Sequence, residues 1–158
     1  MTTRELLLET HAHLPPLSVL DGLGPADAES RSAGAPHSIA EIVRHMAFWQ
    51  DWFLRRCGGT VEPAPAAAAL GWPAVASGSW PAVTTDFRDG LKRLADFAEG
   101  GALDMPITPA IEFPLLAHYT LQDAVVHVAC HNAHHLGQVI VLRQISGRWP
   151  PPSGSYTW

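Results

Sequence analysis

The sequence predicts an all-α protein, a four-helix bundle with long connections. Apolar residues recur at three- and four-residue spacing over 39–57, 80–98 and 121–145, the pattern of helices that bury one face. The stretches between these segments are rich in Pro, Gly and Ala and show no strand-like alternation. With 158 residues, 47% of them hydrophobic, the chain is long enough for one core. We therefore expect a single domain over residues 1–158.

The first helix is expected over residues 4 to about 13, where three consecutive leucines at 6–8 supply an apolar face. The pair Pro15-Pro16 must end or kink this helix, because proline lacks the N–H group that a helix interior needs. Residues 21–36 are rich in Gly, Ala, Ser and Asp, so they are expected to form a connection.

The second helix begins at a capping box, Ser38-Ile39-Ala40-Glu41, whose serine and glutamate side chains satisfy backbone N–H groups of the first turn. It is expected to stop at Gly58-Gly59, since glycine is common just past helix ends. Its apolar stripe consists of Ile39, Ile42, Val43, Met46, Trp49 and Phe53. Residues 60–78 are expected to be a linker that wraps the surface.

The third helix is expected from Trp80 or Pro81 to Ala98, since proline is tolerated in a first turn. Residues 102–119 contain three prolines and leave room only for a short extended piece. A second capping box, Thr120-Leu121-Gln122-Asp123, opens the fourth helix, which continues to about Ile145. The aromatic tail, residues 149–158, is expected to pack over one end of the bundle.

Two histidines of the fourth helix, His131 and His135, are the strongest functional signal. Side chains at i and i+4 point in nearly the same direction, so two imidazoles could reach one metal ion. Both stand at positions that the apolar pattern assigns to the core, where an unpaired polar group costs about 1 to 3 kcal/mol. A catalytic zinc-type site has three protein ligands. The best candidate for the third is His45, at the margin of the second helix's apolar face.

Each histidine also has a purely structural interpretation. His45 alone could be a hydrogen-bonded, half-buried side chain, and His131 could instead pair with His127, which has the same spacing. His127 and His134 fall on the flank of the helix, where they would face solvent or hydrogen-bond a metal ligand. Four further histidines have no partner at ligand spacing and are expected on the surface: His11, His13, His37 and His118.

Other polar residues near the pair leave the chemistry open. Gln138, one turn beyond His135, could bond a water or substrate at the metal, or cap the wet end of the bundle. Cys130 points about 100° away from His131, so it is expected to be a buried filler. Asn132 stands where a zinc protease would have glutamate, and the chain has neither a phosphate loop nor a nucleophile elbow. No catalytic residue is assigned.

Composition and charge exclude several kinds of partner. The formal net charge is −5 and the ten Lys and Arg residues are scattered, so the chain lacks the basic surface that nucleic-acid binding needs. The first ten residues resemble neither a signal peptide nor a membrane span. We therefore expect a cytoplasmic protein that binds neither nucleic acid nor membranes, with Cys57 and Cys130 both reduced.

Three stretches carry a family resemblance over nearly the whole chain: residues 38–46 leading into Trp49, the run His131-Asn132-Ala133-His134-His135-Leu136-Gly137-Gln138, and the ending 147–154. In these stretches the chain resembles the DinB/YfiT-like superfamily of metal-binding four-helix bundles. Members place a divalent metal, often nickel or zinc, on one histidine of the second helix and two of the last long helix. The resemblance therefore implies His45, His131 and His135 as metal ligands.

The resemblance also implies an activity. Relatives include enzymes that use the thiols mycothiol, bacillithiol or glutathione, and others described as metal-dependent hydrolases. We therefore expect a divalent-metal-binding protein that acts on a small molecule as a thiol-dependent S-transferase. A metal-dependent hydrolase and a non-catalytic, self-associating bundle are the alternatives. Relatives often dimerise, so a homodimer is expected. A thiol would need a cationic rim, for which Arg44 and Arg143 are the nearest candidates by sequence.

Overall fold

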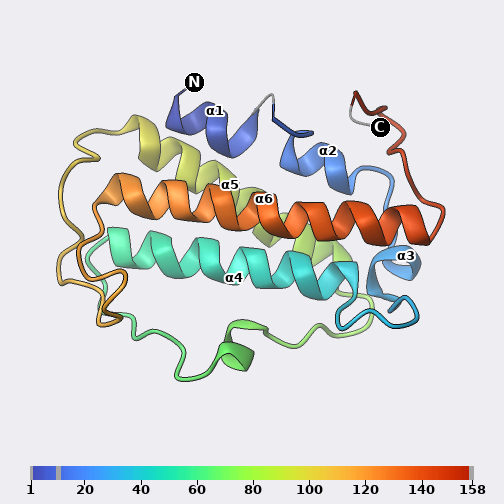
Figure 1. The fold of residues 1–158 in the computed structure, drawn as a ribbon, viewed down its shortest axis with the longest axis horizontal. Helices are drawn as coiled ribbons and strands as arrows, with labels where there is room; N and C mark the ends of the chain where they lie inside the picture. Colours follow the sequence, from blue (N-terminus) through green and yellow to red (C-terminus); the bar gives the residue numbers. More distant parts are fainter. Residues whose placement is uncertain (1, 10–11, 157–158) are drawn as a thin grey trace.

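The computed structural model describes residues 2–9 and 12–156, and within these residues it is helical without a β-strand. Three long helices make the body of the molecule: α4 (Ile39–Cys57), α5 (Trp80–Glu99) and α6 (Leu121–Ile145). They lie side by side in Figure 1, and each contacts the other two. No described helix combines the length and the apolar content needed to cross a bilayer. The predicted all-α bundle is confirmed, with the long helices within one residue of their predicted bounds.

Two short helices, instead of one, fill the fourth position of the bundle. α1 (Thr3–Leu8) contacts α5 and α6, and α2 (Pro16–Leu20) contacts α6 (Figure 1). The helix predicted over 4–13 is therefore too long, because the chain bends at 12–13 and brings Leu14 into the core at 4% exposure. Pro16 then begins a new helix, since its fixed backbone angle suits the first helical position.

A further short helix, α3 (Pro25–Glu29), lies in the segment predicted as a plain connection. Its Glu29 carboxylate accepts hydrogen bonds from the backbone N–H groups of Gly78 (2.8 Å) and Trp80 (2.9 Å), at the start of α5. A helix N-terminus leaves such donors unpaired and favours negative charge. The prediction missed α3 because a helix of five residues shows no apolar periodicity.

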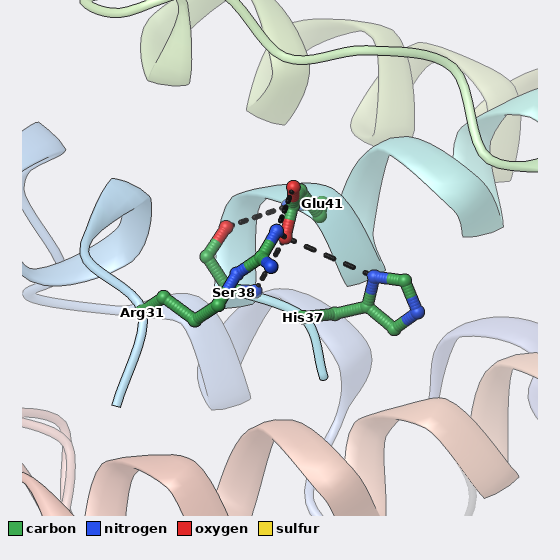
Figure 2. Close-up of polar contacts among 4 residues, drawn as sticks. All are labelled: Arg31, His37, Ser38 and Glu41. Atoms are coloured by element: carbon green, nitrogen blue, oxygen red, sulfur yellow. Dashed lines mark hydrogen bonds and ion pairs between the residues drawn. The ribbon is translucent and has the colours of Figure 1, made fainter. Parts of the chain in front are cut away.

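Capping boxes fix the starts of α4 and α6, as predicted. In the first box the Glu41 carboxylate accepts from the Ser38 N–H (2.7 Å), and it also accepts two bonds from Arg31 (2.6 and 2.8 Å). Figure 2 shows that it lies beside His37, at 3.8 Å from Nδ1. Burial works to raise the pKa of Glu41, but these bonds and charges lower it overall. Glu41 thus holds the segment before α4 against the helix.

The connection from α4 to α5 is long because the two helices run in the same direction. Figure 1 shows it returning along α4 to the end where α4 began. The Trp52 indole N–H donates to the Pro63 carbonyl (3.1 Å), and a 3₁₀ turn, η1 (Ala68–Gly71), lies below the middle of α4 in that view. The predicted surface linker is confirmed, and it brings Gly71 beside α4.

A polar layer separates two hydrophobic clusters along the bundle. Residues 136 and 139 of α6 belong to one cluster, together with Phe87 of α5, and residues 124–129 of α6 belong to the other. Between them on α6 lies the segment 131–135, whose Asn132 is only 2% exposed. Gln50 of α4 is fully buried at a comparable level, between the two clusters. The histidine-bearing part of α6 therefore sits at the middle of the bundle.

Two buried arginines clamp the connections onto the bundle. Arg56, at the end of α4, donates to the carbonyls of Pro109 (2.9 Å) and Ala110 (2.8 Å). Arg143, near the end of α6, donates to the carbonyls of Asp21 and Arg148 (both 2.9 Å) and to that of Val19. With 2% of its surface exposed, Arg143 has no free guanidinium to offer a thiol. The prediction that it lines a cationic rim is wrong.

Replacing Arg143 with methionine is expected to lower the free energy of unfolding by roughly 2 to 4 kcal/mol, because buried carbonyls lose their donors. Urea denaturation followed by far-UV circular dichroism measures this change. Arg148→Met is the control, since Arg148 is exposed and its ion pair with Asp27 contributes little. Equal stability of the two variants would contradict the clamp.

The tail packs over the end of the bundle that α2 covers, as predicted for residues 149–156. The Ser153 N–H donates to the Asp21 carboxylate (3.0 Å), and the Tyr156 hydroxyl donates to the His13 carbonyl (2.7 Å). Pro151 is buried. The last two residues of the predicted tail, 157–158, lie outside the described part of the chain.

Candidate metal centre

Three histidines from two helices converge at the middle of the bundle. His45 comes from α4, and His131 and His135 come from α6, one turn apart. One ring nitrogen of each lies within 4.8 Å of the others, and the Nε2 atoms of His45 and His131 are 3.1 Å apart. His45 is 6% exposed and His135 is 7% exposed. The packing of α4 against α6 therefore brings together the three residues that the sequence singled out.

The inner face of α6 differs from the predicted one by one residue. His135 is buried as expected, but His131 is only partly buried, and its neighbour Asn132 takes the core position. Asn132 lies four residues from both Val128 and Leu136, so all three share one face. The histidines consequently project from the edge of the core toward α4. The prediction missed Asn132 because a polar residue was not counted in the apolar pattern.

Hydrogen bonds fix the orientation of two of the rings. His45 Nδ1 lies 2.5 Å from the Gly71 carbonyl, and His135 Nδ1 lies 2.8 Å from Oε1 of Gln138. A carbonyl oxygen only accepts, so in both rings Nδ1 carries the proton and Nε2 keeps its lone pair, which in His45 faces Nε2 of His131 at 3.1 Å. The Gln138 amide then donates to Nε2 of His134 (3.3 Å). Gln138 and His134 thus support His135 from outside the cluster.

An aromatic stack covers one side of the cluster. The Trp72 ring, just after η1, stacks on His45 at 3.8 Å between centroids, and His37 stacks on Trp72 at the same distance. His37 is half-buried, and its Nδ1 lies 3.8 Å from the Glu41 carboxylate, on the other side from α6 (Figure 2). The prediction that His37 is a plain surface residue is therefore wrong. The position of Trp72 beside the cluster could not be predicted from the sequence, because Trp72 lies in a loop without periodicity.

Burial lowers the pKa of all three clustered histidines and so favours their neutral form. The pKa of His45 is lowered from 6.5 to about 4, mainly by burial. The hydrogen bond to Gly71 raises it, and the nearby His135 and His37 lower it. Burial, followed by the charges of the neighbouring histidines, lowers the pKa of His131 to about 3. Neutral imidazoles keep the lone pairs that metals bind, and no carboxylate belongs to this cluster of described residues. The donor set fits Zn, Ni, Cu or Fe.

The remaining candidates lie outside the cluster. His127 bonds the Tyr119 hydroxyl through Nδ1 (3.0 Å), so the alternative pair of His127 with His131 is not the one that converges with His45.

Cys130 is exposed, which contradicts the predicted buried filler, because its side of α6 faces solvent. Arg44 pairs with Asp86 of α5 and does not border the cluster, so the predicted cationic rim is absent there. His118 is exposed, and His11 lies outside the described residues.

Two pockets lie on either side of the cluster along α6, and a third, more open one of about 610 Å³ also reaches His131, from the side of that helix that carries Cys130 and His134. The first, the aromatic pocket, has a volume of about 630 Å³ and reaches His131; its walls include Trp49, Trp52, Phe53, Phe113, Leu116 and Tyr119. The second, the C-terminal pocket, has a volume of about 410 Å³ and reaches Gln138; its walls include Ile42, Trp72, Val141, Leu142 and Ile145. Both are lined mainly by apolar atoms.

A comparison with protein-family models places the chain. The model of the DinB superfamily matches residues 16–139. The chain belongs to the DinB superfamily. The matched range contains all three clustered histidines and Gln138, whereas the ending 147–154, part of the resemblance seen in the sequence, lies outside it. No curated protein and no solved structure matches the chain.

Replacing Gln138 with leucine is expected to weaken metal binding about tenfold, because His135 loses the acceptor that fixes its ring. Competition against a chromophoric chelator measures the affinity. Gln144→Leu, the same change at an exposed position of α6, is the control and should leave the affinity unchanged. Equal affinities for the two variants would show that Gln138 does not orient the ligand.

Proposed function

We propose that the protein is a divalent-metal-dependent enzyme that transfers a small-molecule thiol to a second substrate. One observation carries the proposal: the cluster of three neutral imidazoles lies between two apolar pockets, one on each side along α6. The aromatic pocket reaches His131 itself, and the C-terminal pocket reaches Trp72 and Gln138, which contact His45 and His135, so two substrates could approach the cluster from opposite sides. When bound, the ion would supply positive charge that lowers the pKa of a coordinated thiol or water.

The chain's own residues prepare the site for such an ion. The Gly71 carbonyl and Gln138 hold the rings of His45 and His135 with their Nε2 lone pairs free. Trp72 stacks on His45 and keeps water from that side of the ring. Rings that are already oriented and neutral lose little freedom when they bind a metal, which favours affinity.

Metal-dependent hydrolysis is the second candidate, and the charge of the pockets favours it. Neither pocket has a lysine or arginine among its described lining residues. Thiols such as glutathione carry carboxylates, which these walls would leave without a cationic partner. A water molecule needs no such partner, so an apolar ester or amide could be cleaved there without a thiol.

Metal content is the first test of the proposal. Protein purified without added ions is expected to hold about one nickel or zinc ion per chain, because three nitrogen ligands suit these borderline metals. Elemental analysis measures the stoichiometry. Protein that takes up no ion, even when nickel or zinc is supplied, would support a non-catalytic helical bundle.

Thiol dependence separates the two enzymatic candidates. With 1-chloro-2,4-dinitrobenzene the thiol sulfur bonds to the ring carbon, chloride leaves and the thiol proton passes to the buffer. The proposal expects this rate to rise with mycothiol, bacillithiol or glutathione and to disappear in His135→Ala. Cleavage of p-nitrophenyl acetate that needs the metal but no thiol would favour the hydrolase.

We also propose a homodimer in the cytoplasm. Val141 and Ile145, one turn apart on α6, are 51% and 66% exposed, and apolar side chains at such positions favour self-association. Cys57 and Cys130 are both free, which suits a reducing compartment. Light scattering is expected to give twice the chain mass for the wild type and a monomer for Ile145→Asp.

A further inference from the structure

The aromatic pocket continues directly from the candidate metal centre. His131 belongs to both, and the Trp49 ring lies 6.5 Å from the His131 ring between centroids. α4 lines it through Trp49, Trp52 and Phe53, and the connections after α4 and before α6 supply most of the remaining wall. A substrate held at the three histidines could therefore extend a side group into this pocket.

Two polar groups of this pocket are already paired, whereas Nδ1 of His131 is buried without a partner. The Trp52 indole N–H donates to the Pro63 carbonyl, and the Tyr119 hydroxyl bonds Nδ1 of His127. Arg56, close by in the sequence, is not a wall of the pocket, and it donates to backbone carbonyls instead. A carboxylate or phosphate entering here would lose its water and find no lysine or arginine among the described walls. Aromatic faces, in contrast, bind other rings well.

We propose that the aromatic pocket receives an uncharged aromatic group of the substrate, next to the metal centre. The position of this group next to a metal ion rests on the proposed function, whereas the binding of an aromatic group in the pocket does not. The C-terminal pocket is the less suitable site for such a group, since it is smaller and is walled partly by the loop at 32–37. Of the two substrates, the apolar acceptor thus belongs on the His131 side.

A pair of metal-binding probes isolates the contribution of the pocket. Acetohydroxamate and benzohydroxamate differ by a phenyl ring and bind metal through the same group. Benzohydroxamate is expected to bind the zinc-loaded protein about tenfold tighter, the gain for a ring that leaves water in part. Isothermal titration calorimetry measures the ratio. A carboxylate on that ring, as in 4-carboxybenzohydroxamate, is expected to remove the gain.

Two variants distinguish the pockets. Phe113→Ala removes a half-exposed wall of the aromatic pocket and is expected to lower the benzohydroxamate advantage at least about threefold. Leu142→Ala trims the C-terminal pocket and should leave the advantage unchanged. An advantage that is absent in the wild type, or that falls in Leu142→Ala and persists in Phe113→Ala, would overturn the assignment.

A neutral fluorescent probe tests the pocket without the metal. N-phenyl-1-naphthylamine is expected to bind chelator-treated wild type and Leu142→Ala equally, and to bind Phe113→Ala more weakly. If acetohydroxamate fails to bind while this pattern holds, the proposed metal function is wrong and the pocket assignment stands. Equal binding of the naphthylamine to all three proteins, or none to any, contradicts the pocket assignment.

Discussion

Replacing His135 with alanine is expected to lower the affinity for a divalent ion by at least about 100-fold, because a three-nitrogen site loses a buried ligand. His131→Ala should have a similar effect, since its Nε2 lies 3.1 Å from that of His45. Elemental analysis of protein dialysed against a limiting zinc concentration gives the stoichiometry. Competition titration with a chromophoric chelator gives the affinity.

The same helix offers two matched controls. His127→Ala is expected to keep the metal, because His127 bonds Tyr119 and stands one turn before the cluster. His134→Ala should also keep it, since His134 is exposed and touches the cluster only through Gln138. If His135→Ala retained a full equivalent of metal while His127→Ala lost it, the ligand pair would lie one turn earlier on α6.

The helices of this bundle could be predicted because their signals are local. A capping box specifies a start through residues three apart, and an apolar stripe specifies the buried face within one helix. α3 and the early end of α1, at Leu8 instead of about His13, were missed because short helices carry weaker signals. Segments of five or six residues bury little surface and show no apolar periodicity, and the one local signal, the capping box of Thr2 and Glu5 at the start of α1, does not say where that helix ends.

The candidate site was predictable only in its helical part. His131 and His135 stand out by their spacing along one helix, and His45 by its place at the margin of the apolar face of α4. The resemblance to DinB proteins implied the same three residues. The Gly71 carbonyl and the Trp72 ring reach His45 from a loop 26 or more residues away, so nothing in local sequence reveals them. A Cβ on Gly71 would lie 3.2 Å from the Trp49 ring, which explains why this position suits glycine. This steric conflict is visible only in the tertiary structure, because Trp49 and Gly71 are far apart in the sequence.

Buried polar residues were the main source of error in the predicted core. Asn132 and Arg143 lie on the inner face of α6, and a pattern that counts only apolar residues cannot place them. Cys130, expected as a buried filler because it points away from His131, is exposed. Polar residues in a core are retained where they hold something else: Arg143 holds the α2 connection, and the histidines offer their nitrogens to an ion.

Acidification is expected to destabilise the protein, with a separate and larger effect when metal is bound. Burial lowers the folded-state pKa of His45 from 6.5 to about 4, so the folded state binds fewer protons than the unfolded state. The contribution of neutral His45 to the free energy of unfolding is therefore fully present above pH 6.5, and it is lost as the pH falls from 6.5 toward 4. For His45 alone the loss is on the order of 3 kcal/mol. His131, with a pKa of about 3, extends the loss to lower pH.

Melting temperatures between pH 4 and 7.5, with and without a chelator, test this prediction. Metal raises the melting temperature at neutral pH because it binds only the folded state, and the gain should vanish as protons compete for the three rings. The chelated protein keeps a smaller acid sensitivity, since burial of the histidines persists without the ion. His131→Ala should lose the metal effect and part of this residual sensitivity. If verified removal of metal left the wild-type melting temperature at pH 7.5 unchanged, bonds such as that from His45 to Gly71 would suffice to hold the cluster.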